Sequence, residues 1–390
     1  MLTNTLTSSE RMHIAFFGCR NAGKSSLVNA FTNQQLSVVS DIKGTTTDPV
    51  KKAIEILPIG PVVIIDTAGL DDDGALGKLR VEKTMQVLGK TDIAVLVVDS
   101  TVGINDYDKD LIKQFEERKL PYVIAYNKCD LIQHPPFEGG KLYISAKTGK
   151  GINELKELLA KISCQNISNR YILRDLIKSG DIIILVIPID ESAPKGRLIL
   201  PQQNVLREIL DSHATAICVQ PEELEETLEK VKPNLVITDS QVFEKVKYIV
   251  SIDIPLTSFS ILMARYKGKL NELINSAKVI SALKDGSKVL ISEGCTHHRQ
   301  CNDIGTVKFP KWLTDYTGKN LNFEFTQGGD FPQDLYRFDI IIHCGGCMIN
   351  EAEMQTRLKL AKEQGIPVVN YGMAIAYMNG ILERALEIFK

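Results

Sequence analysis

The sequence predicts an α/β protein of three domains: a P-loop nucleotide-binding domain with a mostly parallel sheet over 1–165, a small α/β domain over 166–265, and a Rossmann-like domain over 266–390. Three observations lead to this fold class. Short apolar runs of strand length alternate with helical patterns along most of the chain, which is typical of parallel sheets covered by helices. A phosphate-binding octet lies near the N-terminus. Half of the cysteines gather near the C-terminus.

The octet Gly18-Cys19-Arg20-Asn21-Ala22-Gly23-Lys24-Ser25 has the G-x-x-x-x-G-K-S spacing of a P-loop. It follows an apolar run that suits a buried strand, and a helical pattern emerges from Ser26 onward. A loop in that context points its backbone N–H groups at one spot, where the helix N-terminus adds a partial positive charge. We therefore expect 21–26 to bind a nucleotide, with Lys24 on the β- and γ-phosphates and Ser25 on Mg²⁺. The plainer interpretation is a glycine-rich turn.

Residues 12–165 alternate between strands and helices around this loop. The predicted strands are 13–18, 62–66, 93–99, 122–126 and 142–144, and the predicted helices are 26–32, 78–88, 106–118 and 152–162. Ligands of such folds bind beyond the carboxyl ends of the strands. Asp66 and Gly69 of the segment Asp-Thr-Ala-Gly lie at one such end, where Asp66 is expected to hold Mg²⁺ through water and the Gly69 N–H to sense the γ-phosphate. Thr46, in the polar segment 44–48, is expected to close over Mg²⁺.

Two further motifs indicate which base is bound. The segment Asn127-Lys128-Cys129-Asp130 ends a predicted strand, and the Asp130 carboxylate can accept from the N1 and exocyclic amine of guanine, which adenine does not offer. Backbone N–H groups of Ser145-Ala146-Lys147 are expected to meet the guanine O6. All these motifs occur in order, each in its expected place, so the predicted ligand is GTP or GDP.

Composition is that of an ordinary globular protein, with 44% hydrophobic and 24% charged residues and a formal net charge of −2. This balance gives no positive field for nucleic acid. No apolar run is long enough to span a bilayer, and the first residues lack the apolar stretch of a signal peptide. We expect a cytoplasmic protein.

The isolated cysteines Cys19, Cys129, Cys164 and Cys218 are expected to be small buried residues.

The middle of the chain predicts a small sheet. Its strands are expected at 181–187, 216–219 and 235–238, and its helices at 202–210, 222–231 and 241–246. A sheet of this size leaves apolar edges that proteins usually cover, so we expect a homodimer through this region, the alternative being a self-sufficient spacer. Asp190 and Glu191 lie in a Pro/Gly loop after the strongest strand, and a carboxylate there could reach a neighbouring domain. Most such loops are only solvated turns.

The last region predicts a second open parallel sheet, with a cysteine and histidine cluster at its carboxyl edge. Expected strands are 289–292, 321–326, 339–343 and 367–370, and expected helices are 270–283, 305–316, 351–364 and 373–389. Cys295-Thr296-His297-His298 follows one strand and His343-Cys344-Gly345-Gly346-Cys347 another, so their sulfurs are expected to meet at one point. The spacing suits structural zinc and an iron–sulfur cluster on three thiolates equally well.

Two resemblances add to this interpretation. Residues 12–165 resemble GTPases of the TrmE and Era kind, in which the position of Asn21 ligates K⁺; the alternative role for Asn21 is shaping the loop. Leu70 stands where Ras-like proteins place a water-orienting glutamine, which implies slow, K⁺-assisted hydrolysis that serves as a switch. The whole chain, with its C-x-H and H-C-x-x-C signature, resembles the HydF family of FeFe-hydrogenase maturation GTPases.

The HydF resemblance implies a 4Fe-4S cluster on Cys295, Cys344 and Cys347. The fourth position would be labile, with His343 the first candidate and His297, Asp190 and Glu191 weaker ones. It further implies a GTPase scaffold that delivers a diiron precursor to apo FeFe-hydrogenase and works with radical-SAM maturases. The rival hypothesis is a TrmE/Era-like GTPase of RNA modification or ribosome assembly that holds a structural zinc.

Overall fold

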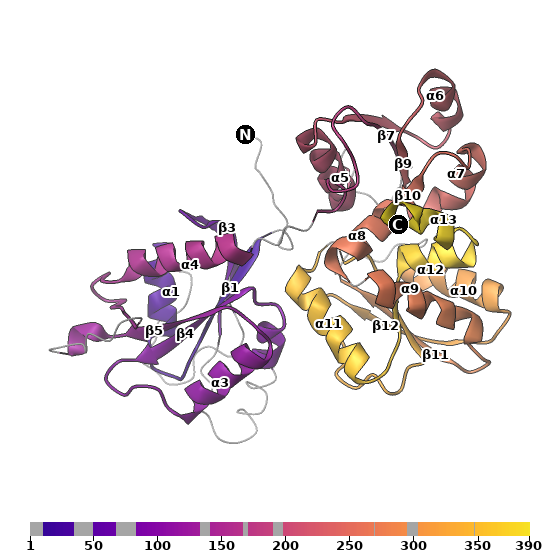
Figure 1. Ribbon diagram of the computed structural model, residues 1–390. Coiled ribbons are helices and arrows are strands. Elements are labelled where there is room, and N and C mark those ends of the chain that lie inside the picture. Colours follow the sequence, from indigo (N-terminus) through magenta and orange to yellow (C-terminus); the bar gives the residue numbers. More distant parts are fainter. Residues whose placement is uncertain are drawn as a thin grey trace. The chain divides into compact units, whose positions relative to one another are not determined.

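The computed structural model describes residues 11–34, 50–67, 83–132, 141–166, 171–189, 198–268, 270–294, 303–346 and 348–390. The chain divides into two compact units, Met1–Ser168 and Asn169–Lys390, and each is described by itself (Figure 1). Among the described helices, none combines the length and apolar character that crossing a bilayer requires.

The first unit is built on a six-stranded sheet in the order β2-β3-β1-β4-β5-β6, in which only β2 runs antiparallel to its neighbour among the described strands. Its strands are β1 (Met12–Phe17), β2 (Val50–Ile56), β3 (Gly60–Asp66), β4 (Ile93–Asp99), β5 (Tyr122–Asn127) and β6 (Leu142–Tyr143). The prediction of a mostly parallel sheet is confirmed. The antiparallel strand β2 was not among the predicted strands.

Helices cover both faces of this sheet. On one face, α1 (Lys24–Thr32) and α4 (Ile152–Asn166) pack on alternate residues of the central strands, and Phe31 is fully buried there. On the other face, α3 (Asp106–Glu117) buries Leu111 and Phe115 against the intervening residues. Strand β4 is apolar and buried up to Asp99, its last residue, since both of its faces are covered.

The second unit contains two four-stranded parallel sheets. The first has the order β10-β9-β7-β8 and the second β12-β11-β13-β14. Their strands are β7 (Ile182–Val186), β8 (Thr215–Val219), β9 (Leu235–Thr238), β10 (Leu256–Ser258), β11 (Lys288–Glu293), β12 (Asn322–Gln327), β13 (Ile340–His343) and β14 (Val368–Asn370). Their main helices are α5 (Leu200–Asp211), α6 (Leu224–Lys230), α7 (Phe243–Ile249), α8 (Phe259–Lys267), α9 (Leu270–Lys278), α10 (Phe309–Thr317), α11 (Glu351–Glu363), α12 (Tyr371–Met378) and α13 (Leu382–Leu386).

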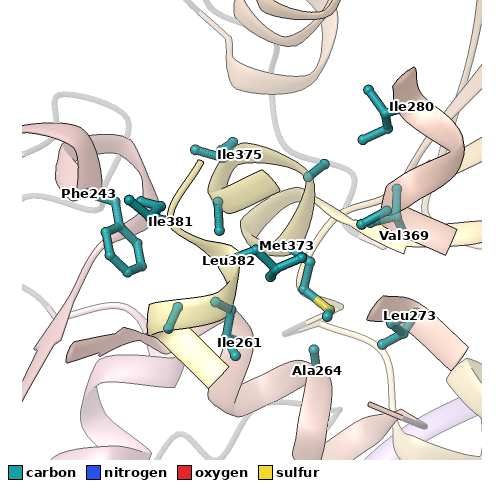
Figure 2. Packing of buried hydrophobic residues seen from close by; sticks show 14 of the residues in the cluster. Phe243, Ile261, Ala264, Leu273, Ile280, Val369, Met373, Ile375, Ile381 and Leu382 are labelled. Atoms are coloured by element: carbon teal, nitrogen blue, oxygen red, sulfur yellow. The ribbon is translucent and has the colours of Figure 1, made fainter. Parts of the chain in front are cut away.

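One hydrophobic core joins these two sheets. It contains Val236 of the first sheet and Ile342 of the second, and Ile261 and Ala264 of α8 lie between them. Figure 2 shows α8 beside Met373 of α12 within this cluster. The expected small middle sheet is present, and much of its apolar surface is covered by the same chain.

The prediction of one continuous helix over 373–389 is wrong. Helix α12 ends at Met378, and Gly380 takes a left-handed φ of 67° before α13 and a final 3₁₀ turn. Asn379-Gly380 is a turn signal that the apolar pattern obscured.

The expectation for the isolated cysteines also needs correction. Cys129 is buried, but Cys19 is half-buried and Cys164 and Cys218 are exposed.

Candidate functional site

The P-loop joins β1 to α1 through backbone conformations that favour particular residues. Gly18 and Gly23 have φ of 139° and 85°, and a Cβ on them would lie 2.2 Å from the Val97 carbonyl oxygen and 2.3 Å from Asn127 Nδ2. Both glycines of the octet are thus required, because a side chain would clash with neighbouring atoms and because the backbone angle is left-handed or otherwise unfavourable for other residues. Asn21 is also left-handed, with φ of 61°, which fits the loop-shaping alternative for this residue.

Two side chains of the octet are fixed by hydrogen bonds within the protein. Lys24 is 7% exposed, and its Nζ donates to the carbonyl oxygens of Gly18 and Cys19 at 2.9 and 2.7 Å, so the ammonium lies within the curl of the loop. Ser25 Oγ donates to Asp66 Oδ2 at 2.6 Å. The structure therefore brings together the hydroxyl and the carboxylate that the sequence assigned to Mg²⁺.

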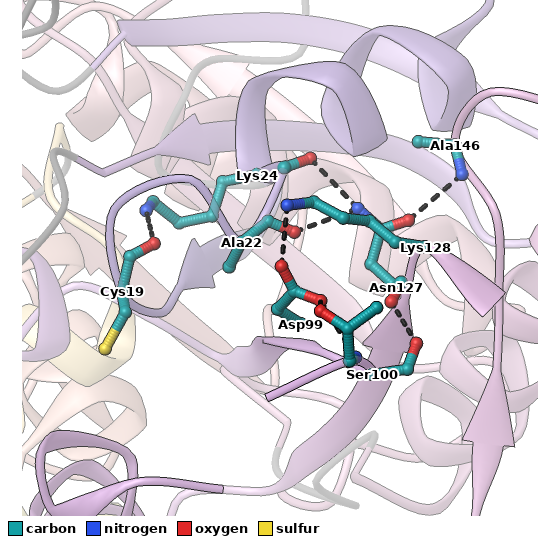
Figure 3. Close-up of polar contacts among 10 residues, drawn as sticks. Cys19, Ala22, Lys24, Asp99, Ser100, Asn127, Lys128 and Ala146 are labelled. Carbon is teal, nitrogen blue, oxygen red and sulfur yellow. Dashed lines mark hydrogen bonds and ion pairs between the residues drawn. The ribbon is translucent and has the colours of Figure 1, made fainter. Parts of the chain in front are cut away.

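Asn127 ties the P-loop to the segment after β6. Its Nδ2 donates to the carbonyl oxygen of Ala22 at 2.9 Å, and its Oδ1 accepts from the backbone N–H of Ala146 at 3.0 Å (Figure 3). The side chain is 2% exposed. Asn127 is thus a buried strut between the phosphate loop and the expected base-binding segment. Its spatial role could not be read from the motif alone.

Asp130 and Lys128 are positioned by further contacts. Ser145 Oγ donates to Asp130 Oδ1 at 2.6 Å, and this hydrogen bond, with the nearby Lys147 and Lys128, holds the pKa of Asp130 below its usual value. Lys128 has a left-handed φ of 63°, and its Nζ lies 2.6 Å from Asp99 Oδ2 at the end of β4. The two motifs of the predicted guanine site are therefore adjacent in the fold.

Several predicted site residues lie outside the described residues. They are Thr46, Gly69, Asp190, Glu191, Cys295, His297 and Cys347. Within the described ranges, no three His, Cys, Asp or Glu side chains are grouped so that they could hold a metal ion. The described members of the cysteine and histidine cluster are His343 and Cys344.

Cys344 follows β13 at the carboxyl edge of the second parallel sheet. Its Sγ accepts from the backbone N–H of Gly294, at the end of β11, at 3.0 Å, and from that of Gly346 at 3.4 Å. Gly294 directly precedes Cys295 in the chain, and Gly346 directly precedes Cys347. Backbone N–H groups directed at a sulfur stabilise its negatively charged form. The donor set around Cys344 therefore suits a thiolate that ligates metal.

His343 is buried and uses both ring nitrogens within the protein. Nδ1 lies 2.8 Å from the carbonyl oxygen of Cys344, so it carries the proton, and Nε2 lies 3.0 Å from Nη1 of Arg357 and accepts from it. Burial, Arg357 and Lys267 lower the pKa of His343 to about 3, so the ring is neutral. In this arrangement His343 offers a metal no ring nitrogen unless it gives up Arg357.

Arg357 was not found by sequence reasoning. Its side chain is 5% exposed and lies behind the carboxyl edge of the sheet, where it also pairs with Glu353 at 2.6 Å and lies over the ring of Phe331. The i,i+4 spacing on α11 signals only the pair with Glu353, and no local spacing signals the contact with His343 at the end of β13. The guanidinium joins the helix to the edge that holds Cys344.

A buried acid and a tyrosine lie on the other side of this edge. Tyr371 donates to Glu293 Oε1 at 3.3 Å, and burial together with the charges of Glu293 and Cys344 strongly raises the tyrosine pKa. A Cβ on Gly305 would come within 2.4 Å of both the Glu293 carboxylate and the Tyr371 hydroxyl. The glycine is therefore needed for close packing at this point.

The fold and site define a class: a P-loop GTPase domain joined to two parallel α/β sheets that share a core. Comparison with known families agrees with each part. Residues 13–128 match the family "50S ribosome-binding GTPase", residues 172–268 the "Hydrogen maturase F dimerization domain", and residues 271–388 the "Hydrogen maturase F tetramerization domain". The chain belongs to the hydrogen maturase F (HydF) family, and its first unit is a GTPase domain.

Curated relatives match the GTPase part. The chain is 34% identical over 158 residues to the tRNA modification GTPase MnmE of Dechloromonas aromatica, covering 39% of this chain and 35% of that protein. It is 34% identical over 170 residues to GTPase Der of Nitratidesulfovibrio vulgaris, covering 39% and 34%. The chain thus spans about a third of the length of these relatives.

The chain is also similar to solved structures of other proteins. Era in complex with MgGDPNP and 16S ribosomal RNA is 21% identical, with a TM-score of 0.35, covering 58% of this chain and 91% of that chain. The G domain of the Thermotoga maritima FeoB iron transporter is 23% identical, with a TM-score of 0.30, covering 39% and 99%.

Proposed function

We propose that this chain is a GTPase scaffold of hydrogenase maturation that holds a 4Fe-4S cluster at the carboxyl edge of its last sheet. In this role it would carry a diiron precursor and deliver it to apo FeFe-hydrogenase. Membership of the hydrogen maturase F family supports a maturation role. The cluster, the cargo and the delivery step go beyond that membership and are argued from the site.

The observation that supports the cluster most strongly is the pair of N–H donors on the Cys344 sulfur. They come from Gly294 and Gly346, the residues before Cys295 and Cys347, and from two different strand ends. Three thiolates delivered from these two loops match the ligand set of a 4Fe-4S cluster with one exchangeable position. When bound, the cluster supplies an open iron to which a diiron unit can be bridged.

In this proposal, the residues around Cys344 have different roles. The backbone amides of Gly294 and Gly346 orient and stabilise the Cys344 thiolate. His343 fixes the main chain of Cys344 and keeps its Nε2 on Arg357. We therefore assign the fourth iron position to an exogenous ligand or to another side chain, with His297, Asp190 and Glu191 as the candidates within this chain.

The GTPase unit is proposed to act as the timer of the scaffold. Lys24 would contact the β- and γ-phosphates, and Ser25, Thr46 and Asp66 would hold Mg²⁺ directly or through water. Asp130 and the 145–147 segment would read guanine. Asn21 would ligate a K⁺ ion that assists slow hydrolysis, with Gly69 sensing the γ-phosphate. Hydrolysis would then change which partner the chain binds.

We propose that partner binding involves a homodimer through the middle sheet, together with radical-SAM maturases and apo-hydrogenase. The family matches carry the words dimerization and tetramerization, which supports self-association. The net charge of −2 gives no positive field for nucleic acid.

Anaerobic reconstitution with ferrous iron and sulfide tests this function. We expect the wild-type chain to turn brown and to bind iron and sulfide in equal amounts, with an electron paramagnetic resonance signal after reduction. Cys344→Ser should lose most of this iron. Cys164→Ser, which changes an exposed cysteine of α4 in the GTPase unit, serves as the matched control and should load normally. A colourless protein that binds zinc instead, or equal loading of Cys344→Ser, would contradict the proposal.

A further inference from the structure

A lysine from the middle sheet region is buried beside the cysteine loop. Lys267 is the last residue of α8 and is only 6% exposed. Its Nζ donates to the carbonyl oxygen of Gly346 at 2.6 Å and to that of Ile349 at 2.9 Å. These two carbonyls belong to the loop that leads from Cys344 through Cys347 to α11. The ammonium thus holds the loop on both sides of Cys347.

The main chain of Lys267 is fixed as well. Gln355 Nε2, on α11, donates to the Lys267 carbonyl oxygen at 2.6 Å. The lysine therefore cannot move without disturbing both the loop and the helix that follows it. It belongs to the segment that matches the dimerization domain, whereas the loop belongs to the segment that matches the tetramerization domain.

Two buried cations lie next to the loop, and the buried acid Glu293 lies on the other side of the same edge. Arg357 lies behind His343 on one side, and Lys267 lies against the loop on the other. Helix α11 begins at Glu351, just after the loop, and its amino end adds a partial positive charge. Of the nearby carboxylates, Glu353 is paired with Arg357, and Glu293 accepts from the Tyr371 hydroxyl. Buried cations are costly unless an anion lies near, so this field favours an anionic occupant.

We propose that Lys267 is a positioning residue for the iron–sulfur site, which fixes the Cys344–Cys347 loop through its carbonyls and stabilises the negative charge of the thiolates and the bound cluster. The inference rests on the proposed function for its second half. Residues that contact the metal ligands without binding the metal orient those ligands and tune the metal site. Removing such a residue typically reduces metal affinity about 10–100-fold. A positive charge close to the cluster also favours its reduced form.

Three variants test the two halves. Lys267→Met keeps the length of the side chain and removes the charge and the donors, and Lys267→Gln keeps a donor without the charge. Lys267→Arg restores the charge. The matched control is Lys278→Met, at the exposed end of the neighbouring helix α9. Circular dichroism establishes which variants are folded; if Lys267→Met is not, Lys267→Gln takes its place in each measurement.

The first measurement uses metal-free protein and hydrogen exchange of the amides over 344–350. We expect faster exchange in Lys267→Met than in wild type and no change in Lys278→Met. The second uses reconstituted protein. We expect iron loss to a chelator to be about 10–100-fold faster in Lys267→Met, and its cluster midpoint potential to be more negative, with Lys267→Arg returning toward wild type.

Unchanged exchange, chelation rate and potential in the folded Lys267→Met variant would overturn the inference. The proposed function fails in a different way, because a wild-type chain that takes up no iron and sulfide refutes the cluster itself. In that case faster loop exchange in Lys267→Met would still support the positioning role, and unchanged exchange would refute it.

Discussion

The Ser145 hydroxyl donates to the Asp130 carboxylate at 2.6 Å and connects the two motifs of the predicted guanine site. The same Ser145 Oγ accepts from the backbone N–H of Thr148 at 3.2 Å, so the hydroxyl is oriented toward Asp130. This hydrogen bond is the main cause of the lowered pKa of Asp130, and it favours the ionised carboxylate further. A fixed, ionised carboxylate is what recognition of the guanine N1 and amine requires.

Asp130→Asn should therefore change the nucleotide preference. Xanthine carries a carbonyl oxygen where guanine carries its amine, and the Asn amide can donate to it. We expect GTP affinity to fall about 10- to 100-fold, since a bidentate contact to a base contributes about 1–3 kcal/mol of discrimination. Xanthosine triphosphate should bind the variant better than GTP. Fluorescent-nucleotide competition measures both affinities.

Asp110→Asn is the control for this exchange, because it removes an exposed carboxylate of α3 in the same unit. It should leave both affinities as they are. If Asp130→Asn binds GTP as the wild type does, Asp130 does not read the base.

The potassium assignment of Asn21 is best tested with Asn21→Gly. Asn21 has a φ of 61°, so alanine would add backbone strain, whereas glycine adopts this conformation freely and removes only the carboxamide. We expect GTP turnover in K⁺ and Na⁺ buffers to become equal in this variant. Steady-state phosphate release in the two buffers measures the ratio.

Asn33→Gly provides the matched comparison for potassium, because Asn33 has a φ of 52° at the end of α1 and lies outside the P-loop. It should keep the wild-type ratio of K⁺ to Na⁺ turnover. A ratio that persists in Asn21→Gly would leave Asn21 with the loop-shaping role alone.

Much of the fold followed from local patterns, and the exceptions have tertiary causes. The apolar runs that became β4 and β7 are buried on both faces, so composition alone marks them. Strand β2 is a half-exposed edge strand that carries Lys51, Lys52 and Glu55, and it exists because β3 pairs with it. Strand β10 is three residues long, too short for any periodicity.

The site was predictable where the chemistry is local in sequence. The octet predicts the roles of Lys24 and Ser25, and the Gly-Gly between Cys344 and Cys347 predicts a loop that reverses direction. Arg357 and Lys267 are different: Lys267 reaches the loop from α8, 79 residues earlier in the chain, and Arg357 contacts His343 from within α11, where no motif marks it. Buried cations of this kind look like ordinary surface charges in a sequence, and only the packing of helices on strand ends identifies them.

Arg357→Leu should strongly destabilise the second unit. The variant removes one partner of a buried ion pair, so Glu353 loses its ion pair with Arg357 and His343 Nε2 loses the donor it accepts from. Breaking a buried ion pair in this way costs about 3–5 kcal/mol. Urea unfolding followed by circular dichroism should show this loss. Arg337→Leu is the control, since the Arg337–Glu324 pair is about half exposed and should be worth at most about 1 kcal/mol. If both variants lost the same free energy of unfolding, burial would not determine how much an ion pair stabilises this unit.

Strand β8 is the edge at which the predicted homodimer can be tested. Strand β8 ends its sheet, and no described strand pairs with its outer side. The opposite edge strand, β10, is covered by α13, and Thr257 Oγ1 donates to the Ala385 carbonyl oxygen at 2.9 Å. The sequence of β8 is mostly apolar, and its Cys218 is exposed. An open apolar edge of this kind pairs readily with a second chain, and a lysine placed on it prevents such pairing.

We expect Cys218→Lys to weaken the dimer at least about tenfold, equal to about 1.4 kcal/mol, because two copies of the new charge would be brought together at the interface. Light scattering over a range of protein concentrations measures the dissociation constant. Leu158→Lys, which places the same charge at a 37% exposed position on α4 of the GTPase unit, should leave the dimer intact. A dimer of unchanged strength in Cys218→Lys would place the interface elsewhere, because a fixed like charge at a paired strand edge cannot be accommodated without loss of affinity.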